Sequence, residues 1–302
     1  MVTRFDTISF LTDYGTTDEF VGVVKAVIRD LAPHVTVVDL THGIPPFDVQ
    51  AGALALARCI AYVPAGVVLA VIDPGVGTTR RAVAIEVAGG AGVRVGPDNG
   101  LLAPAVAVAG GAERAVELTN PEYQLATPGA TFAGRDVFAP AAAHLCNGVP
   151  LTELGPEIDP GLLLPATVPL PRTEPAEDDG REVVFAQVLW VDRYGNCQLN
   201  VGPDDLPEDW GPHVQLRYHT HTTFADPSGM QTRSAIRATS FADLGGGTVG
   251  LVLDSYGMLA VCLDQRSAAE ELGLTAGDQV ILSALDAPPA PTTPVTLAPR
   301  PQ

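Results

Sequence analysis

Two aspartates stand where a ligand site is expected, each at the end of an apolar stretch with the composition of a buried strand. Asp13 ends TISFLTD, and Asp73 ends GVVLAVID. In doubly wound α/β sheets, ligands bind beyond the carboxyl ends of the strands. One such aspartate is commonly a turn or cap residue, but two in one sheet favour a shared site. The sequence therefore predicts a polar site at that edge of a sheet.

Arg80 lies in the same loop as Asp73, DPGVGTTRR, whose glycines allow a tight turn. A phosphate-binding loop would need a helix directly after the glycines and, in a Walker loop, a lysine. Here a strand pattern, RRAVAIEV, follows, and the single lysine of the chain, Lys25, lies elsewhere. The loop is therefore expected to aim Asp73 and Arg80 into a cleft. The alternative is a surface loop with a solvated arginine pair.

The first half of the chain alternates strand and helix patterns. Thr16 and Glu19 match a capping box for a first helix, and Asp48 is placed to cap a second helix that runs through Tyr62. AVAIEV and VRVGPD, joined by a Gly-rich turn, predict a hairpin. These patterns predict an N-terminal α/β domain with a mostly parallel central sheet. Its expected strands include residues 7–13, 35–40 and 66–73.

A stretch rich in proline and acidic residues, PATVPLPRTEPAEDDG, separates this half from the next. Beyond it, short apolar strands alternate with turns, and one short helix follows Ser267, which is placed to cap it. This pattern predicts a mostly antiparallel C-terminal β-barrel domain. We expect the N-terminal domain over residues 1–170, a linker over 171–182, the barrel over 183–286 and a Pro-rich tail over 287–302.

The composition excludes several functions. The chain has 302 residues, 46% of them apolar, and a formal net charge of −18, which argues against nucleic-acid or anionic-membrane partners. The four cysteines lie far apart and no signal peptide is apparent, so we expect reduced thiols in a cytoplasmic protein without a membrane span. His219 and His221 form a His-x-His pattern without nearby carboxylates or cysteines, so no metal site is expected.

Further polar loops occur in the second half. DRYGN places Asp192 and Asn196 at a strand end, where they either bind an ammonium or a base edge, or only hold a turn. DSYG and QRSAAE are similar loops. Phe47, which follows two prolines, and Phe241 are each either packing residues or platforms for a flat ring.

Seven motifs occur in order along nearly the whole chain: FLTDYGTTDEFVG, THGIPPFD, VIDPGVGTTRR, GPDNGLL, TFAGRDVFAP, DRYGN and DSYGMLAV with QRSAAE. This set resembles the S-adenosylmethionine (SAM) hydroxide adenosyltransferases, or SAM hydrolases, relatives of the fluorinase and the chlorinase. The resemblance implies a homotrimer, with each active site between the N-terminal domain of one subunit and the C-terminal domain of the next. It also implies that water or hydroxide attacks C5′ of SAM, giving adenosine and L-methionine without a cofactor.

The resemblance also implies roles for individual residues. In the N-terminal domain, Asp13 would hold the ribose hydroxyls and Phe47 would pack on the nucleoside, while Thr131, Phe132 and Gly134 would shape the C5′ pocket. In the C-terminal domain, Asp192 would hold the methionine ammonium. Ser255 and Tyr256 would lie near the methionine carboxylate. The halogenase pattern has Arg at the position of Tyr256. The adenine would be bound by Asn196, Phe241, Ser267 and the backbone of Ala268.

The same motifs distinguish hydrolases from halogenases. In the pattern typical of the halogenases, Tyr-Pro stands where this chain has Asp73-Pro74. The fluorinase pattern has Thr where this chain has Val76. Asp73 and Arg80 are both present, as in the hydrolases, which favours water as the nucleophile. The third polar residue of the hydrolases is a His in TFHGRD, and this chain has Ala133 there.

The residue expected to handle the water is therefore replaced by Ala133. Losing a positioned acid–base group typically costs on the order of 10²–10⁴-fold in rate, so we expect a weakened hydrolase. Asp73 would anchor the water, and Arg80 would lower the pKa of Asp73. One alternative is a halogenase-like enzyme of the chlorinase type, in which Ala133 and Gly134 leave room for an anion. The other is a non-catalytic protein that binds SAM or adenosine.

The remaining residues of TFAGRDVFAP have a structural interpretation. We expect Arg135 and Asp136 to anchor the turn, and Asp136 to cap the helix formed by DVFAPAAAHLC.

Overall fold

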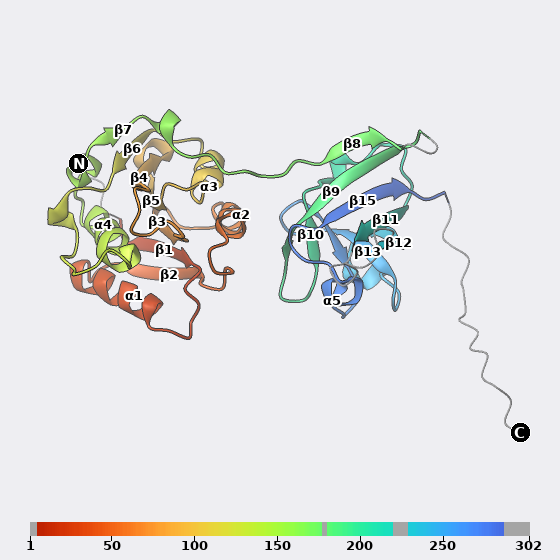
Figure 1. Ribbon diagram of the computed structural model, residues 1–302, viewed down its shortest axis with the longest axis horizontal. Coiled ribbons are helices and arrows are strands. Elements are labelled where there is room, and N and C mark those ends of the chain that lie inside the picture. Colours follow the sequence, from red (N-terminus) through yellow and green to blue (C-terminus); the bar gives the residue numbers. More distant parts are fainter. Residues whose placement is uncertain (1–4, 177–179, 220–228, 287–302) are drawn as a thin grey trace, which may run out of the picture. The chain divides into compact units, whose positions relative to one another are not determined.

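The chain divides into two compact units, Met1–Val168 and Pro169–Gln302 (Figure 1). The computed structural model describes residues 5–176, 180–219 and 229–286. His221 and the expected Pro-rich tail lie outside the described residues.

The first unit is an α/β domain with a seven-stranded sheet in the order β2-β1-β3-β5-β4-β6-β7. The first four strands in this order are mutually parallel, and the last three pair antiparallel with their neighbours. The mostly parallel sheet and the β4–β5 hairpin confirm the prediction. The strands are β1 (Thr7–Thr12), β2 (Thr36–Thr41), β3 (Gly66–Val71), β4 (Ala82–Val87), β5 (Gly92–Pro97), β6 (Arg114–Glu117) and β7 (Glu157–Ile158).

Helices cover both faces of this sheet. Helices α1 (Phe20–Leu31) and α4 (Ala139–Cys146) pack on one face, and α2 (Val49–Cys59) and α3 (Ala103–Val108) pack on the other (Figure 1). Every residue of β3 is buried, and its side chains alternate between the two apolar cores: Leu69 lies in one and Ala70 in the other. Because β3 is buried on both faces, its carboxyl end is the rigid base from which Asp73 projects.

Two helix starts test the capping predictions. The Asp48 carboxylate accepts a hydrogen bond from the Ala51 amide at 2.8 Å, so Asp48 caps α2 as expected. That helix ends at Cys59, before the predicted Tyr62. The capping box at Thr16 and Glu19 was wrong: α1 begins only after Glu19, which occupies the cap position without a side-chain hydrogen bond.

The second unit is a closed β-barrel. Its strands follow the order β10-β14-β13-β12-β11-β15-β9-β8, and β9 also pairs with β10, which closes seven of them into a ring. Closure is possible because the long β9 pairs with β15 in its first half and with β10 in its second half. The prediction of a barrel is confirmed. The elements are β8 (Arg172–Pro175), β9 (Glu182–Val191), β10 (Cys197–Leu199), β11 (His213–His219), β12 (Met230–Ala238), β13 (Val249–Leu253), β14 (Leu259–Cys262), α5 (Ala268–Leu272) and β15 (Gln279–Ala284).

The start of the second unit is more structured than its composition indicates. Strand β8 lies inside the stretch 171–182 that was predicted as a linker, and it pairs antiparallel with β9. All four residues of β8 are exposed and the strand ends in a proline, so it is an edge strand whose composition is that of a linker.

All four cysteines are free in the structure, where three are buried and Cys59 is half-buried. Within the described residues, no helix combines the length and the apolar character that a membrane span requires. The same part of the chain contains no cluster of His, Cys, Asp and Glu with the makings of a metal site.

Candidate active site

Asp73 and Arg80 form a buried ion pair just beyond the carboxyl end of β3. Arg80 Nε donates to Asp73 Oδ1 at 2.9 Å, and Arg80 Nη2 donates to Asp73 Oδ2, so the pair is bidentate. Their side chains are 6% and 12% exposed. The Arg80 guanidinium also lies 5.4 Å from the centre of the Phe138 ring. Strand β4 follows the loop directly, as predicted, so no helix is present for a phosphate-binding loop.

The electrostatic effect of this pair differs from the prediction. Burial is the largest influence and raises the pKa of Asp73, while the charge and hydrogen bonds of Arg80 lower it. Arg80 thus lowers the pKa of Asp73 as expected, but the net pKa is raised because the effect of burial is larger. Desolvation wins because a buried carboxylate loses its hydration and one arginine replaces only part of it. Asp73 is therefore a better proton acceptor than the sequence indicated.

Asp13 positions the loop that carries Phe47. The Asp13 carboxylate accepts a hydrogen bond from the Phe47 amide at 2.8 Å. Phe47 has a φ of 69°, which is rare for a residue with a side chain, and the residue is 72% exposed. Such strain is found most often at functional sites, where the surrounding structure holds it in place. An exposed ring on a fixed backbone suits the predicted platform for a flat ligand better than core packing.

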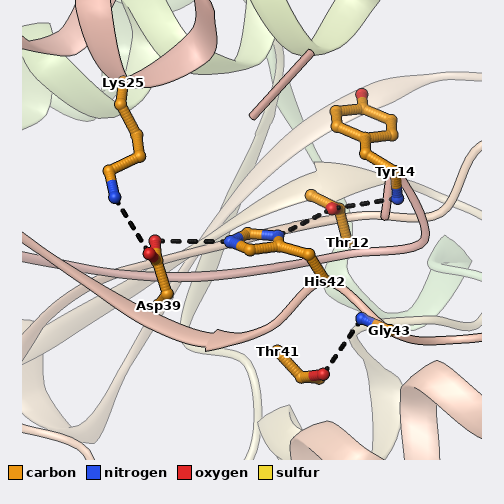
Figure 2. Close-up of polar contacts among 7 residues, drawn as sticks. All are labelled: Thr12, Tyr14, Lys25, Asp39, Thr41, His42 and Gly43. Carbon is orange, nitrogen blue, oxygen red and sulfur yellow. Dashed lines mark hydrogen bonds and ion pairs between the residues drawn. The ribbon is translucent and has the colours of Figure 1, made fainter. Parts of the chain in front are cut away.

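A chain of polar contacts fixes the end of β1 and the loop that follows it (Figure 2). Thr12 Oγ1 lies 2.8 Å from His42 Nδ1 and also accepts a hydrogen bond from the Tyr14 amide at 3.1 Å. His42 is buried, and its Nε2 lies 3.3 Å from Asp39 Oδ1, although not aligned for a hydrogen bond. Lys25 Nζ donates to Asp39 Oδ2 at 2.9 Å.

This chain of contacts is charged at its outer end. Burial raises the pKa of Asp39, but the hydrogen bond from Lys25 and the close contacts with Lys25 and His42 outweigh it, and the net pKa is lowered. The backbone of His42 also accepts a hydrogen bond from the Gly15 amide at 2.8 Å. The loop that carries Asp13 and Tyr14 is therefore tied to β2 and to the residues that follow it.

The position of Gly134 in TFAGRD is not an empty space, because the Tyr14 hydroxyl lies where a side chain would begin. A Cβ on Gly134 would lie 2.2 Å from the Tyr14 hydroxyl oxygen, a separation at which the hydroxyl would have to move. Ala133 is half-buried and precedes a single π-helical turn, Gly134–Phe138, of the kind often found at functional sites. Sequence reasoning missed Tyr14, because a tyrosine in a loop gives no signal of where its hydroxyl lies.

The rest of this motif anchors the turn. Arg135 Nε donates to the buried Asp136 carboxylate at 2.5 Å, and Thr127 also donates to it. The predicted helix cap at Asp136 was wrong: Ala133 occupies the cap position of the π-helical turn, and no side chain caps it. Phe132 is half-buried, and Thr131 is exposed.

In the barrel, two turns have the same sequence pattern and the same geometry. Asp192 Oδ1 accepts hydrogen bonds from the amides of Tyr194 at 2.8 Å and Asn196 at 2.9 Å. In the matching turn, Asp254 Oδ1 accepts from the amides of Tyr256 at 2.8 Å and Met258 at 3.0 Å. Each aspartate thus holds a turn, and each turn presents a tyrosine.

Both turns line one cavity of about 500 Å³ in the barrel unit. A neighbouring cavity of about 370 Å³ shares part of this lining, including Asn196 and Phe241. The first cavity contains five of the predicted residues, and sequence reasoning missed two aromatic residues beside them. Its lining includes Asp192, Asn196, Phe241, Ser255 and Tyr256, together with Trp190 and Tyr194.

Ser267 and Ala268 lie beside the first turn. A Cβ on Gly195 would lie 2.1 Å from Ser267 Oγ, so only glycine allows the two loops to meet. Ser267 Oγ accepts a hydrogen bond from the Glu270 amide at 3.1 Å, which confirms it as the cap of α5. Ser267 lines the smaller cavity, while the Ala268 side chain is buried in the barrel core, so only the Ala268 backbone is suited to a ligand.

The predicted residues are therefore assembled in two groups, one within each unit. Both units carry polar loops that hold aromatic side chains in place, and the first adds a buried acid–base pair. The chain therefore belongs to the class of proteins that combine an α/β domain with a closed β-barrel domain, and each unit carries its own group of candidate site residues.

Comparison with known proteins identifies this class more closely. Residues 8–155 match the model of the SAM hydroxide adenosyltransferase N-terminal domain, and residues 186–281 match the model of the C-terminal domain. The chain belongs to the SAM hydroxide adenosyltransferase family.

Named relatives lie on both sides of the hydrolase–halogenase division. The chain is 43% identical over 277 residues to an (R)-S-adenosyl-L-methionine hydrolase of Salinispora arenicola, a match that covers 92% of this chain and 97% of the relative. It is 29% identical over 295 residues to a fluorinase of Actinoplanes, covering 89% and 95%. A crystal structure of an uncharacterized conserved protein from Thermotoga maritima superposes with a TM-score of 0.76 at 32% identity, covering 91% and 99%.

Replacing His42 with alanine should loosen the loop that carries Asp13 and Tyr14. The change removes a buried hydrogen-bond partner of Thr12 and should lower the free energy of unfolding by about 1–3 kcal/mol. We expect faster amide hydrogen exchange in the peptide covering residues 12–18. His34→Ala, at an exposed position, is the control and should leave that exchange unchanged. Equal exchange in the two variants would contradict this role of His42.

Proposed function

We propose that this chain hydrolyses SAM, with water displacing methionine from C5′ to give adenosine and L-methionine. The observation that carries the proposal is the buried Asp73–Arg80 pair beyond the end of β3. The relative named as an (R)-S-adenosyl-L-methionine hydrolase, at 43% identity, supports the same reaction.

The reaction is an in-line displacement at carbon. The water oxygen forms a bond to C5′ while the C5′–S bond breaks, and the electron pair of that bond stays on sulfur. The sulfonium thereby becomes the neutral thioether of methionine, and the water loses one proton. Holding the water about 3–3.5 Å from C5′, opposite sulfur, supplies much of the rate acceleration.

Asp73 is the group best suited to receive that proton. Its pKa is raised by burial, which brings it closer to the range of an effective general base. Arg80 engages both carboxylate oxygens and fixes the orientation of the carboxylate, the Gly75 amide takes one further lone pair, and one lone pair remains for the water. Asp73 then anchors the water, accepts its proton and passes that proton to solvent.

The remaining site residues would bind the substrate. We assign Asp13 to the ribose hydroxyls and Phe47 to the nucleoside face, with Thr131, Phe132, Ala133 and Gly134 around C5′. In the barrel cavities we assign Asp192 to the methionine ammonium and the turn of Ser255 and Tyr256 to the methionine carboxylate. Asn196, Phe241, Ser267 and the backbone of Ala268 would bind the adenine. The aromatic and acidic lining of these cavities suits a flat base and the ammonium group of the methionine.

We further propose that the active enzyme is a cytoplasmic homotrimer that needs no cofactor, with each site formed by the N-terminal unit of one subunit and the barrel of the next. The support is that each unit carries only its own group of site residues. Light scattering of the purified chain measures the mass; a monomer that turns over SAM at full rate contradicts the shared site.

A halogenase is disfavoured by the same pair of residues. A carboxylate at Asp73 would repel a halide, and its pairing with Arg80 leaves little net positive charge to attract one. Chloride-dependent formation of chlorinated adenosine would nevertheless establish that alternative. A binding protein without activity is the other alternative, and calorimetry together with product chromatography distinguishes it.

Incubation of the purified chain with SAM should yield adenosine and methionine in equal amounts. Asp73→Asn should lower kcat by at least about tenfold, because it removes the proton acceptor, and should change the affinity for SAM much less. Asp98→Asn is the matched control, since Asp98 forms a buried ion pair with Arg81 in the same unit. SAM binding without adenosine after prolonged incubation would rule out hydrolysis by this chain.

The pH dependence should reflect the ionisation of Asp73. Asp73 must be ionised to accept a proton, so activity is present above its raised pKa and is lost as the pH falls through it. We expect kcat/KM to fall on the acid side at a pH higher than an ordinary carboxyl group would give. The Asp73→Asn variant should lack this dependence, and a variant with an unchanged acid limb would exclude Asp73 as the group that titrates.

Placing a histidine at position 133 should accelerate the reaction. Imidazole would add a second proton acceptor near the water, and the gain in kcat should be at least about tenfold. The measurement is steady-state turnover of Ala133→His against the unmodified chain, with Ala130→His, at an exposed nearby position, as control. If both variants turn over SAM at the rate of the unmodified chain, position 133 does not face the water.

A further inference from the structure

Tyr14 is held in one orientation by aromatic packing. Its ring centre lies 5.8 Å from that of Phe20 and 5.8 Å from that of Phe132, and the rings of Phe20 and Phe132 lie 5.1 Å from each other. The Tyr14 amide is fixed by Thr12, and the ring points away from His42 (Figure 2). The position of the hydroxyl is therefore set by the fold and not by a flexible loop.

The hydroxyl end of Tyr14 rests on the backbone of Gly134. The Cβ of any larger residue there would lie 2.2 Å from the hydroxyl oxygen and 3.2 Å from the ring carbon that bears it. Glycine at 134 thus makes room for the hydroxyl itself, at the residue that follows Ala133. Tyr14, Phe132 and Ala133 also pack against the same apolar core.

Two carboxylates of the site act on this hydroxyl. Burial is the main cause that raises the pKa of Tyr14, and the charges of Asp13 and Asp73 raise it further. The phenol therefore keeps its proton at neutral pH, and it does not act as a base there. Among the described residues, no group forms a hydrogen bond with the Tyr14 hydroxyl, so its lone pairs remain available to a water molecule.

We propose that the Tyr14 hydroxyl is the second hydrogen-bonding group that orients the attacking water, opposite Asp73. This inference rests on the proposed hydrolysis of SAM. One hydrogen of the water points to the Tyr14 oxygen and the other to the Asp73 carboxylate, so a lone pair of the water faces C5′. As the O–C5′ bond forms and the C5′–S bond breaks, the proton goes to Asp73, and Tyr14 remains neutral throughout.

This arrangement explains how a chain with alanine at position 133 keeps a polar contact for the water. Two fixed hydrogen-bond acceptors determine the orientation of a water molecule, whereas one leaves it free to rotate. Tyr14 supplies orientation but no proton acceptance, so the site is slower than one with a histidine and faster than one with neither group.

The test is Tyr14→Phe, which removes only the hydroxyl and keeps the ring packing. We expect kcat to fall by about tenfold to a hundredfold, with KM nearly unchanged, because the contact is to the water and not to SAM. Tyr62→Phe, which removes an exposed hydroxyl, is the matched control and should keep full activity. A fall in kcat that is matched by loss of thermal stability, or an effect confined to KM, would overturn the inference.

A second background separates this inference from the proposed function. In Ala133→His, the imidazole would hold the water, so Tyr14→Phe should lower kcat much less than it does in the unmodified chain. Equal losses in both backgrounds, or no loss in an active unmodified chain, would overturn the role of Tyr14 and leave hydrolysis standing. If neither the unmodified chain nor Ala133→His forms adenosine, hydrolysis itself fails, and the role of Tyr14 fails with it.

Discussion

The candidate site depends on a carboxylate that is buried without being neutralised. The Asp73 carboxylate, just beyond the end of β3, is buried and therefore loses hydration. Arg80 restores part of the lost stabilisation through two hydrogen bonds. A buried charge that is incompletely compensated has a raised pKa and a high affinity for a proton. That residual cost makes Asp73 useful, because a fully compensated carboxylate would be too weak a base to accept a proton from water.

Much of the first unit serves to hold this charge in place. The six buried residues of β3 fix the backbone on which Asp73 stands, and Phe138 packs against the Arg80 guanidinium. On the neighbouring strand, the contacts from Thr12 through His42 to Asp39 and Lys25 fix the loop that carries Asp13. Both loops thereby gain rigidity from groups that need never touch a ligand.

Local sequence patterns were sufficient to predict most helices and strands but not the contacts between residues distant in the sequence. The buried strand before Asp73, the cap at Asp48 and the β4–β5 hairpin each depend on neighbouring residues, and all three were predicted. Strand β8 was missed because an edge strand needs only a partner, and its exposed residues have the composition of a linker. The direction of the Asp73 pKa shift was missed because it depends on burial, which no loop sequence reveals.

The clearest case of such a limit is the pair formed by Tyr14 and Gly134. In the sequence, the small residues at 133 and 134 indicate only that a functional side chain is absent, and Tyr14 has no feature that distinguishes it from other loop residues. In the folded chain, the absence of a Cβ at Gly134 is what admits the Tyr14 hydroxyl. A glycine can therefore be required at a position because a large side chain, distant in the sequence, packs against its backbone. The same logic applies to Gly195, where Ser267 occupies the space of a side chain, so a glycine in each unit marks a close approach within that unit's group of candidate site residues.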